Sequence, residues 1–302
     1  MSNLDNLFSQ RLNLLQERLQ QETGARLSVA FQDIQSNEKY GVNASRPGWA
    51  ASMIKVPVLI SVFRSIDDGK LSFDEEVAID HRYTLDSTSE ISYRQQGSTA
   101  PVSELVNYMI LASCNESTNM LAARVGIPYI NSLMRQLGCP NTAMSHLLHV
   151  GATLEDPGID GTSSNTTTAE EMTALMGGIY RNTVASVQSC EYMRKILEND
   201  SSLEYGGASV NHYLNRALPA GTRIGAKCGI LEEDVMETAV INGDYALTVM
   251  FNKVPASFFG EASRLLSLIS GVIFERYYLN EDHNEETQNQ KESPRRLEGV
   301  EQ

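Results

Sequence analysis

Residues 46–63 read RPGWAASMIKVPVLISVF, a loop that runs into the longest apolar stretch of the chain, Val56 to Phe63. Arg-Pro-Gly is typical of a loop, so we expect a helix to begin at Ser52. Lys55 then lies one helical turn from Ser52, on the same face. Pro57 opposes this helix only mildly, because it removes one hydrogen bond close to the helix start.

The pair Ser52 and Lys55 has the composition of an activated nucleophile with its base. At a helix start, free backbone N–H groups and the positive end of the helix dipole favour an alkoxide or oxyanion. A neutral lysine one turn away can take the hydroxyl proton. The pattern alone is weak, because about one S-x-x-K is expected by chance in such a chain. Ser36 to Lys39 is a second match, and a capping serine with a surface lysine is the structural alternative.

Two further short motifs follow in the chain. Residues 113–115 read Ser-Cys-Asn between two expected helices, and residues 227–229 read Lys-Cys-Gly on an expected strand. Together with S-x-x-K, these motifs resemble those of class A β-lactamases and penicillin-binding proteins, the active-site serine penicillin-recognising enzymes. That superfamily carries S-x-x-K at the start of a buried helix, then S-D-N, then K-T-G on a sheet strand.

The resemblance extends through the flanking sequence and covers roughly residues 25–280. It includes the lead-in to the serine, the turn after the nucleophile helix, the segment after the omega loop and the approach to K-T-G. These segments are residues 43–47, 68–74, 165–172 and 218–222.

The resemblance implies a role for each matched position. Ser52 is the nucleophile that forms an acyl-enzyme, and Lys55 is its proton acceptor or electrostatic partner. Ser113 relays a proton to the leaving group, and Asn115 donates a hydrogen bond to the substrate amide. Lys227 binds a substrate carboxylate and keeps Lys55 and Ser113 poised by repulsion.

The same resemblance places the oxyanion hole at the backbone N–H groups of Ser52 and Ile230, beside the substrate-binding positions Cys228 and Gly229. Cys228 replaces the threonine of K-T-G, and a thiol hydrogen-bonds a carboxylate poorly. Cys114 replaces the aspartate of S-D-N. A buried, inert cysteine is the simpler interpretation at both positions.

The omega loop departs most from the family pattern. Class A β-lactamases place a glutamate there, about fourteen residues before the Thr-Thr stretch, to activate the deacylating water. Counting back from Thr166 reaches Ala152, and the nearest acids are Glu155 and Asp156. Glu155 is therefore a possible deacylation base, with a solvated loop acid as the alternative. Without a base, the acyl-enzyme persists or Lys55 activates the water.

The order of expected elements is helix, strands, a long helical middle, strands and helix. Helices are expected at 4–22, 52–66, 102–110, 119–125, 130–137, 169–180, 187–197 and 256–278, and strands at 27–31, 37–42, 224–228, 236–242 and 245–251. Residues 27–31 alternate as in a half-buried strand. This order predicts an α+β fold, with an antiparallel sheet built from both chain ends, flanked by terminal helices, and an inserted all-α region.

We expect one catalytic domain over residues 1–279. Its sheet part spans about 1–60 and 215–279, and its helical part about 61–214. Residues 280–302 are polar and carry almost nothing to bury, which predicts a disordered tail.

Composition excludes several functional classes. With 24 basic and 38 acidic residues, the net charge is −14 and the isoelectric point about 4.8. Nucleic acids and anionic membranes need a basic surface, so neither is an expected partner. No apolar run approaches the ~18 residues of a membrane-spanning helix. The N-terminus lacks the features of a signal peptide, which predicts a cytoplasmic protein unless a leader has been removed.

The remaining candidate residues carry no clear site. The cysteines show no C-x-x-C pair and the histidines no cluster, so we expect free thiols, no metal and no cofactor. The histidines read as surface or packing residues, and Trp49 as a core residue. The residues concerned are Cys114, Cys139, Cys190, Cys228, His81, His146, His149, His212 and His283.

The leading hypothesis is a serine hydrolase of the class A β-lactamase type, which cleaves a small-molecule amide or ester. A cell-wall DD-peptidase with penicillin-binding activity, or an amidase or esterase of the cytoplasm, is the alternative on the same scaffold. A non-catalytic ligand-binding module is the alternative outside the enzymes. The two substituted cysteines favour the module, and the intact motif residues oppose it. The oligomeric state stays open.

Overall fold

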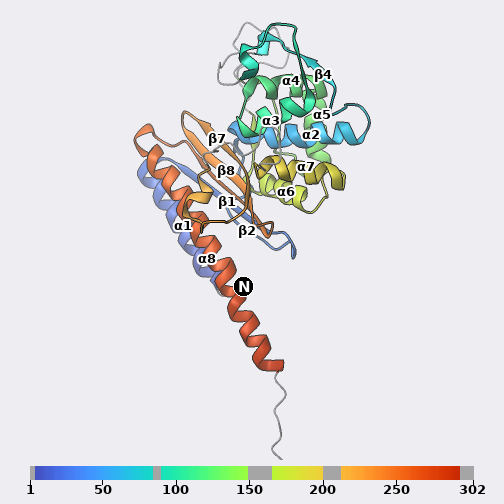
Figure 1. Ribbon diagram of the computed structural model, residues 1–302. Helices are drawn as coiled ribbons and strands as arrows, with labels where there is room; N and C mark the ends of the chain where they lie inside the picture. The colour runs from blue at the N-terminus through green and yellow to red at the C-terminus, as the bar shows by residue number, and fades with distance from the viewer. Residues whose placement is uncertain (1–3, 84–89, 149–164, 200–211, 293–302) are drawn as a thin grey trace, which may run out of the picture.

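The computed structural model describes residues 4–83, 90–148, 165–199 and 212–292 (Figure 1). Its main feature is a five-stranded antiparallel sheet in the order β2-β1-β9-β8-β7. The strands are β1 (Arg26–Asp33), β2 (Lys39–Val42), β7 (Ile224–Leu231), β8 (Asp234–Ile241) and β9 (Tyr245–Asn252). The pairing of β1 with β9 joins the two ends of the chain, so the predicted α+β architecture is confirmed.

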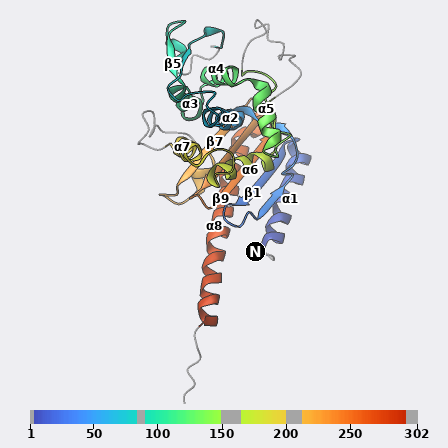
Figure 2. The same ribbon diagram turned by 90° about the vertical axis from the view of Figure 1, so that its right-hand side faces the viewer.

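Helices α1 (Leu4–Thr23) and α8 (Phe259–Glu292) cover one face of the sheet (Figures 1 and 2). The odd-numbered residues of β1 and β9, such as Leu27 and Val249, are buried beneath them. The even-numbered residues, such as Ala30, are buried on the opposite face, under α6 (Ala169–Tyr180). Strand β1 is therefore buried on both faces, and the expectation of a half-buried strand was wrong. The small side chain of Ala30, and the glycine at position 177 of α6 beside Gln32, leave room for that helix.

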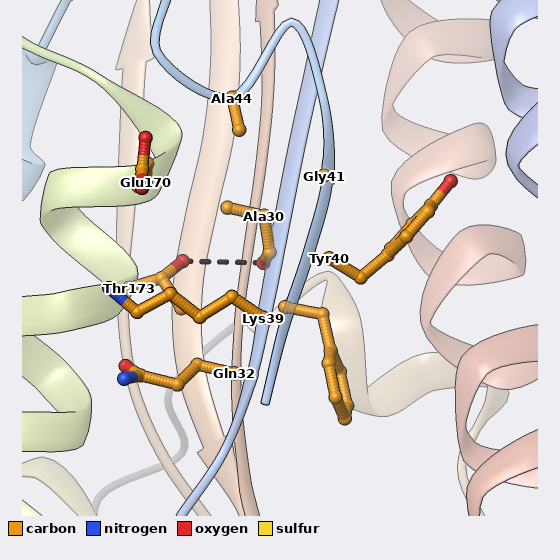
Figure 3. A pocket seen from close by; sticks show the side chains of 9 residues that line it. Ala30, Gln32, Lys39, Tyr40, Gly41, Ala44, Glu170 and Thr173 are labelled. Atoms are coloured by element: carbon orange, nitrogen blue, oxygen red, sulfur yellow. Dashed lines mark hydrogen bonds between the residues drawn. The ribbon is translucent and has the colours of Figure 1, made fainter. Parts of the chain in front are cut away.

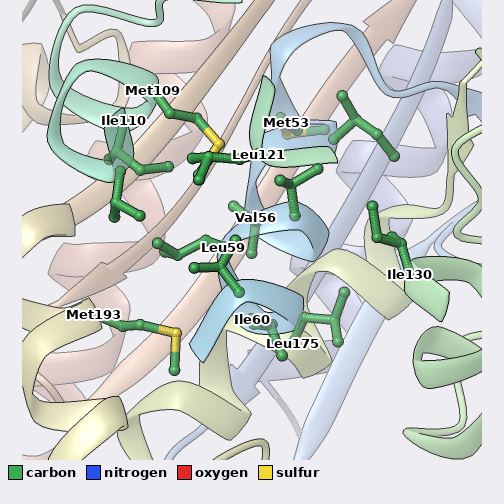
Figure 4. Close-up of a cluster of buried hydrophobic side chains, with 14 of the residues drawn as sticks. Met53, Val56, Leu59, Ile60, Met109, Ile110, Leu121, Ile130, Leu175 and Met193 are labelled. Atoms are coloured by element: carbon green, nitrogen blue, oxygen red, sulfur yellow. The ribbon is translucent and has the colours of Figure 1, made fainter. Parts of the chain in front are cut away.

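The helical part is built around α2 (Lys55–Asp67), which contacts each of the helices from α3 to α7. Its side chains fill the centre of a cluster in which Leu59 and Ile60 are fully buried (Figure 4). The other helices here are α3 (Val102–Leu111), α4 (Asn115–Val125), α5 (Ile127–Gln136) and α7 (Val187–Leu197). Two short strand pairs complete it: β3 (Gly48–Trp49) with β6 (Thr166–Thr167), and β4 (Glu76–Ala78) with β5 (Thr99–Pro101).

Single turns of 3₁₀ helix connect several of these elements. They are η1 (Ala51–Ile54), η2 (His81–Tyr83), η3 (Glu90–Tyr93), η4 (Leu214–Ala217) and η5 (Ala256–Phe258). Because η1 precedes α2, the α-helix begins at Lys55 and not at Ser52. Pro57 then lies in the first turn of α2, where its missing N–H has no intrahelical partner to lose. The mild conflict between Pro57 and the helix is thereby removed.

Helix α8 is longer than expected and extends well beyond the sheet (Figure 1). Residues 280–292 continue this helix, so the expectation of a disordered tail from residue 280 was wrong for them. Once residues 259–278 have formed a helix against the sheet, each added residue costs little, because nucleation is already complete. Residues 293–302 lie outside the described residues, and the boundary between the sheet and helical parts stays a prediction.

The first part of α8 together with η5, Ala256–Tyr278, is long and apolar enough to cross a membrane by length and composition alone. No other helix of the described residues meets this test. Ala262, Leu266, Ile269 and Ile273 are buried against the sheet, so packing accounts for much of its apolar character.

We expect Leu59→Ala to lower the free energy of unfolding by about 2–5 kcal/mol, because the lost side chain leaves a cavity at the centre of the helical core. Urea unfolding provides the measurement. The matched control is Leu14→Ala on α1, where the leucine is 63% exposed and the change should stay within about 0.5 kcal/mol. Equal effects of the two substitutions would contradict the burial pattern.

Candidate active site

Ser52 lies in the η1 turn, which backbone contacts hold against the rest of the molecule. The N–H of Ala50 donates to the carbonyl of Asn165 at 2.9 Å, and the N–H of Met53 closes the turn onto Ala50 at 2.9 Å. Ala51 has φ +44°, a left-handed conformation that alanine rarely adopts. Such strain persists only where surrounding contacts enforce it, so the packing fixes the presentation of Ser52.

The side-chain amine of Lys55 contacts three polar side chains, which come from the S-x-x-K motif and from residues 113–115. Its Nζ lies 2.8 Å from Ser52 Oγ, 3.1 Å from Ser113 Oγ and 2.7 Å from Asn115 Oδ1. The lysine is fully buried, with 0% of its surface exposed. A buried amine with its polar groups paired is well suited to exchange a proton with Ser52.

Lys227 reaches the same hydroxyl from strand β7. Its Nζ donates to Ser113 Oγ at 3.0 Å and to the carbonyl of Cys228 at 2.9 Å, and the residue is 2% exposed. Ser113, at φ +52°, is also held in the left-handed region. One serine hydroxyl thus lies between two buried lysines. Ser52, Lys55, Ser113 and Lys227 meet in one site, as the roles implied by the resemblance require.

The pKa of each of the two lysines is lowered, but for Lys55 the charge of the other lysine adds to the effect of burial. Burial, and then the charge of Lys227, hold the pKa of Lys55 well below its ordinary value, while Cys114, Cys228 and Glu116 oppose this shift. Burial also lowers the pKa of Lys227, against the opposing effects of Cys228 and Glu237. Lys55 is therefore the lysine more readily found neutral, as a base must be, and Lys227 the one that more readily stays charged.

Strand β7 lies at the sheet edge and packs closely on η1. A Cβ on Gly229 would approach the Ala51 Cβ and the Met236 Cγ to 3.0 Å each, so only glycine allows this contact without a shift. Ile230, the next residue, is 48% exposed. Trp49 is 47% exposed, so the expectation that it packs in the core was wrong. It pairs with Thr166 in a two-residue strand, which has too little neighbouring structure to cover an indole.

Cys114 has a structural role that the sequence did not indicate. It is the N-cap of α4, and its Sγ accepts a hydrogen bond from the Ser117 backbone N–H at 3.3 Å. Its thiol also donates to Glu116 Oε2 at 3.2 Å. Glu116 is 1% exposed and accepts a second hydrogen bond from Ser92 Oγ at 2.7 Å. This buried carboxylate, two residues from the position of the family aspartate, was missed.

A second buried carboxylate lies on β8, the strand next to β7 in the sheet. Glu237, fully buried on β8, is paired in register with Cys228 and accepts from the backbone N–H groups of Tyr213 and Leu214 at 2.8 and 2.6 Å. Its other oxygen lies 2.7 Å from His212 Nδ1. No sequence pattern predicts this pair, because His212 and Glu237 have no characteristic spacing.

Two asparagines bind the segments on either side of residues 149–164, where the resemblance implies the omega loop. Asn119 bonds both the N–H and the carbonyl of Leu148, and Asn165 Oδ1 accepts from the Ser145 N–H at 2.7 Å. The residues between Leu148 and Asn165 lie outside the described residues. The expectations for His149, Ala152, Glu155 and Asp156 therefore stay predictions, as do those for the His283 side chain.

The second S-x-x-K match lies apart from this site. Ser36 Oγ donates to Asp33 in the turn before β2. Lys39 lines a separate cavity of about 160 Å³ between β1, β2 and α6, where Thr173 donates to the Ala30 carbonyl (Figure 3). Context, more than the motif itself, distinguishes the two matches.

The four cysteines carry free thiols, and Cys114, Cys139 and Cys190 are buried. Among the described residues, no group of three or more His, Cys, Asp or Glu side chains is arranged to hold a metal ion.

Comparison with known proteins gives one family. The family model described as the beta-lactamase enzyme family matches residues 9–277. No curated protein matches.

Solved structures with the same fold include PBP-A, at 23% identity and a TM-score of 0.72, covering 88% of this chain and 97% of that one. A beta-lactamase from Sphaerobacter thermophilus has 21% identity and a TM-score of 0.70, with coverages of 84% and 91%. The chromosome-encoded beta-lactamase of Vibrio parahaemolyticus has 18% identity and a TM-score of 0.73, with coverages of 89% and 98%. At these identities, the likeness shows the fold.

The lowered pKa of Lys55 predicts a pH-dependent stability. Between that value and about 10.4, the ordinary lysine pKa, the unfolded chain binds more protons than the folded one, so stability rises with pH. Lys55→Met removes this contribution. We expect the free energy of unfolding to rise less steeply from pH 7 to 10 in the variant, by up to about 1.4 kcal/mol per pH unit.

Urea unfolding across that range provides the measurement. Lys195 is exposed, so Lys195→Met is the control. Its free energy of unfolding should change with pH in the same way as that of the wild type. Parallel curves for Lys55→Met as well would contradict the argument for Lys55 as a readily neutral base.

Proposed function

The chain belongs to the beta-lactamase enzyme family, and we propose that Ser52 is the nucleophile of a class A type serine hydrolase. On this proposal the protein cleaves an amide or ester through an acyl-enzyme. The supporting observation is the 2.8 Å contact between Ser52 Oγ and the buried Lys55 Nζ, whose pKa is held low. A neutral amine at hydrogen-bonding distance meets the geometric and protonation requirements of a general base.

In the proposed acylation step, Ser52 Oγ attacks the substrate carbonyl as its proton passes to Lys55 Nζ. The carbonyl oxygen gains the negative charge, and we assign its stabilisation to the backbone N–H groups of Ser52 and Ile230. Gly229 supports this assignment, since the absence of its side chain lets β7 approach η1. Each donor of such a pair typically contributes about 10²–10³ in rate.

The collapse of the tetrahedral intermediate needs a proton on the leaving group. Ser113 is suited to deliver it, because its hydroxyl lies 3.1 Å from Lys55 and 3.0 Å from Lys227. The hydroxyl gives its proton to the leaving nitrogen or oxygen and is reprotonated by Lys55, which received the proton of Ser52. The proton balance then closes without a further acid.

The proposed substrate is a small amide, β-lactam-like, or an ester. Lys227 supplies positive charge that binds a substrate carboxylate. The side-chain amide of Asn115 donates a hydrogen bond to the substrate amide. Cys228 replaces a hydroxyl at this position, so carboxylate binding rests more heavily on Lys227. The exposed Ile230 and Trp49 offer apolar contact area.

Covalent labelling tests the nucleophile. We expect Ser52→Ala to lose labelling by a fluorescent penicillin or a fluorophosphonate, and to lose any hydrolysis by on the order of 10³-fold or more. Intact-mass spectrometry provides the measurement, and the free energy of unfolding should change little. Ser36→Ala, in the second S-x-x-K match, is the matched control and should label like the wild type. Undiminished labelling of Ser52→Ala would refute the assignment.

Deacylation generates a second prediction. Because the position expected for the water-activating glutamate is Ala152, we propose that the acyl-enzyme is released slowly, as in a penicillin-binding protein. A missing general base typically costs about 10²–10⁴-fold in its step. A penicillin adduct on Ser52 should therefore be trapped, and Glu155→Gln should change its release rate little.

Single-turnover kinetics of the wild type and Glu155→Gln provide the measurement. Rapid wild-type turnover that collapses in Glu155→Gln would show instead that Glu155 supplies the base and that the protein turns over β-lactams.

A further inference from the structure

A cavity of about 360 Å³, which we call the charged cavity, lies outside the group of Ser52, Lys55, Ser113 and Lys227. Its lining includes three cationic and two anionic side chains together with one buried amide: Arg26, Arg46, Lys253, Glu233, Asp234 and Asn252. Strands β1, β8 and β9 provide the floor, on the sheet face that carries Met236 and Met250. The segment that leads to Ser52 provides one wall, with Arg46 and Trp49.

The floor of the charged cavity holds polar atoms without partners. Asp234 is 2% exposed. Its Oδ1 accepts from Asn252 Nδ2 at 2.7 Å and from the Lys253 N–H at 3.2 Å. Its Oδ2, although buried, has no hydrogen-bond partner among the described residues, and the same holds for Nε of Arg26. Burial raises the pKa of Asp234. Native structures rarely leave such atoms unpaired, because each costs free energy.

The charges of this cavity also remain apart from one another. Within the described part of the chain, no ion pair joins Arg26, Arg46 or Lys253 to Glu233 or Asp234. Asp234 is buried, whereas Arg46, Glu233 and Lys253 are exposed at the rim. The volume lies within the usual range of about 300–1,000 Å³ for small-molecule sites, and the buried polar floor supplies the kind of placed polar groups that fix the orientation of a ligand.

We infer that the charged cavity binds a small zwitterion, an amino acid or short peptide with a free ammonium group and a free carboxylate. The ammonium group lies toward Asp234 and Glu233, and the carboxylate toward Arg46 and Arg26. An anion alone would leave Asp234 Oδ2 unpaired, and a cation alone would leave Arg26 Nε unpaired. A ligand with both groups pairs both ends of the cavity.

This inference goes beyond the proposed function, because it involves none of the motif residues. The two regions are nevertheless linked through Trp49, which lines the charged cavity and stands three residues before Ser52. Trp49 is the only tryptophan of the chain, so its fluorescence reports on this cavity without a label.

Three matched compounds test the inference. Glycylglycine carries both charged ends, N-acetylglycylglycine lacks the ammonium group, and glycylglycinamide lacks the carboxylate. We expect glycylglycine to give a saturable change in Trp49 fluorescence, confirmed by calorimetry. Each blocked compound should bind about ten- to a hundredfold more weakly, the usual effect of losing a charge-assisted hydrogen bond.

Two variants test which residue binds the ammonium group and which binds the carboxylate. Asp234→Asn should bind glycylglycine and its N-acetyl form alike, and Arg46→Gln should bind glycylglycine and its amide alike. Arg18→Gln, an exposed change on α1, is the matched control and should keep wild-type binding. Because Asp234 is buried and its variant is at risk of not folding, the exposed Arg46→Gln keeps the test decisive.

Equal binding of the three compounds, no saturable signal from any of them, or an equal loss in Arg18→Gln would overturn the inference. Ser52→Ala separates it from the proposed function. That variant should lose covalent labelling and keep full glycylglycine affinity, so either proposal can fail without the other.

Discussion

The site depends on one constraint: two buried lysines from distant parts of the chain share the hydroxyl of Ser113. Lys55 comes from the first turn of the central helix and Lys227 from the edge strand. Two buried ammonium groups this close are costly, so at least one must release its proton or find a counter-charge. The fold provides both solutions, since burial lowers the pKa of Lys55, while the negative charges of Glu116 and Glu237 favour the protonated forms of Lys55 and Lys227, respectively. The reactivity proposed for Ser52 is thus a consequence of the cost of burying Lys55.

Much of this arrangement was readable from the sequence. Hydrophobic periodicity predicted the α-helices and the strands of the five-stranded sheet, but none of the short strands β3 to β6. The order of the three motifs, and the family that they resemble, implied that Ser52, Lys55, Ser113 and Lys227 meet. These features depend on local patterns and on topology, which the chain order carries directly. The features that were missed depend on what lies across a tertiary contact. Exposure of Trp49 depends on the neighbours of a two-residue strand, and burial of β1 on both faces depends on where α6 packs.

The polar side chains around the site also depend on tertiary contacts that the sequence does not reveal. Cys114 reads as an inert thiol until its backbone conformation places it at the start of α4, where its sulfur caps the helix. Glu116 and Glu237 carry no motif, and only the structure shows that each is a buried carboxylate with several donors. The length of α8 was missed because composition predicts the stability of an isolated segment, whereas here the sheet has already nucleated the helix.

The pairing of β1 with β9 also governs how the protein can be made. Val29 lies opposite Val249, so during translation β1 leaves the ribosome long before the strand that completes its ladder exists. At ~5–20 residues per second, β1 waits on the order of ten to forty seconds with an apolar face and an unpaired edge. Helices of the inserted region can form in that interval, but the sheet and the shared serine cannot. During that interval β1 exposes the kind of apolar strand that chaperones recognise, and a nascent chain that stops before β9 cannot complete the sheet.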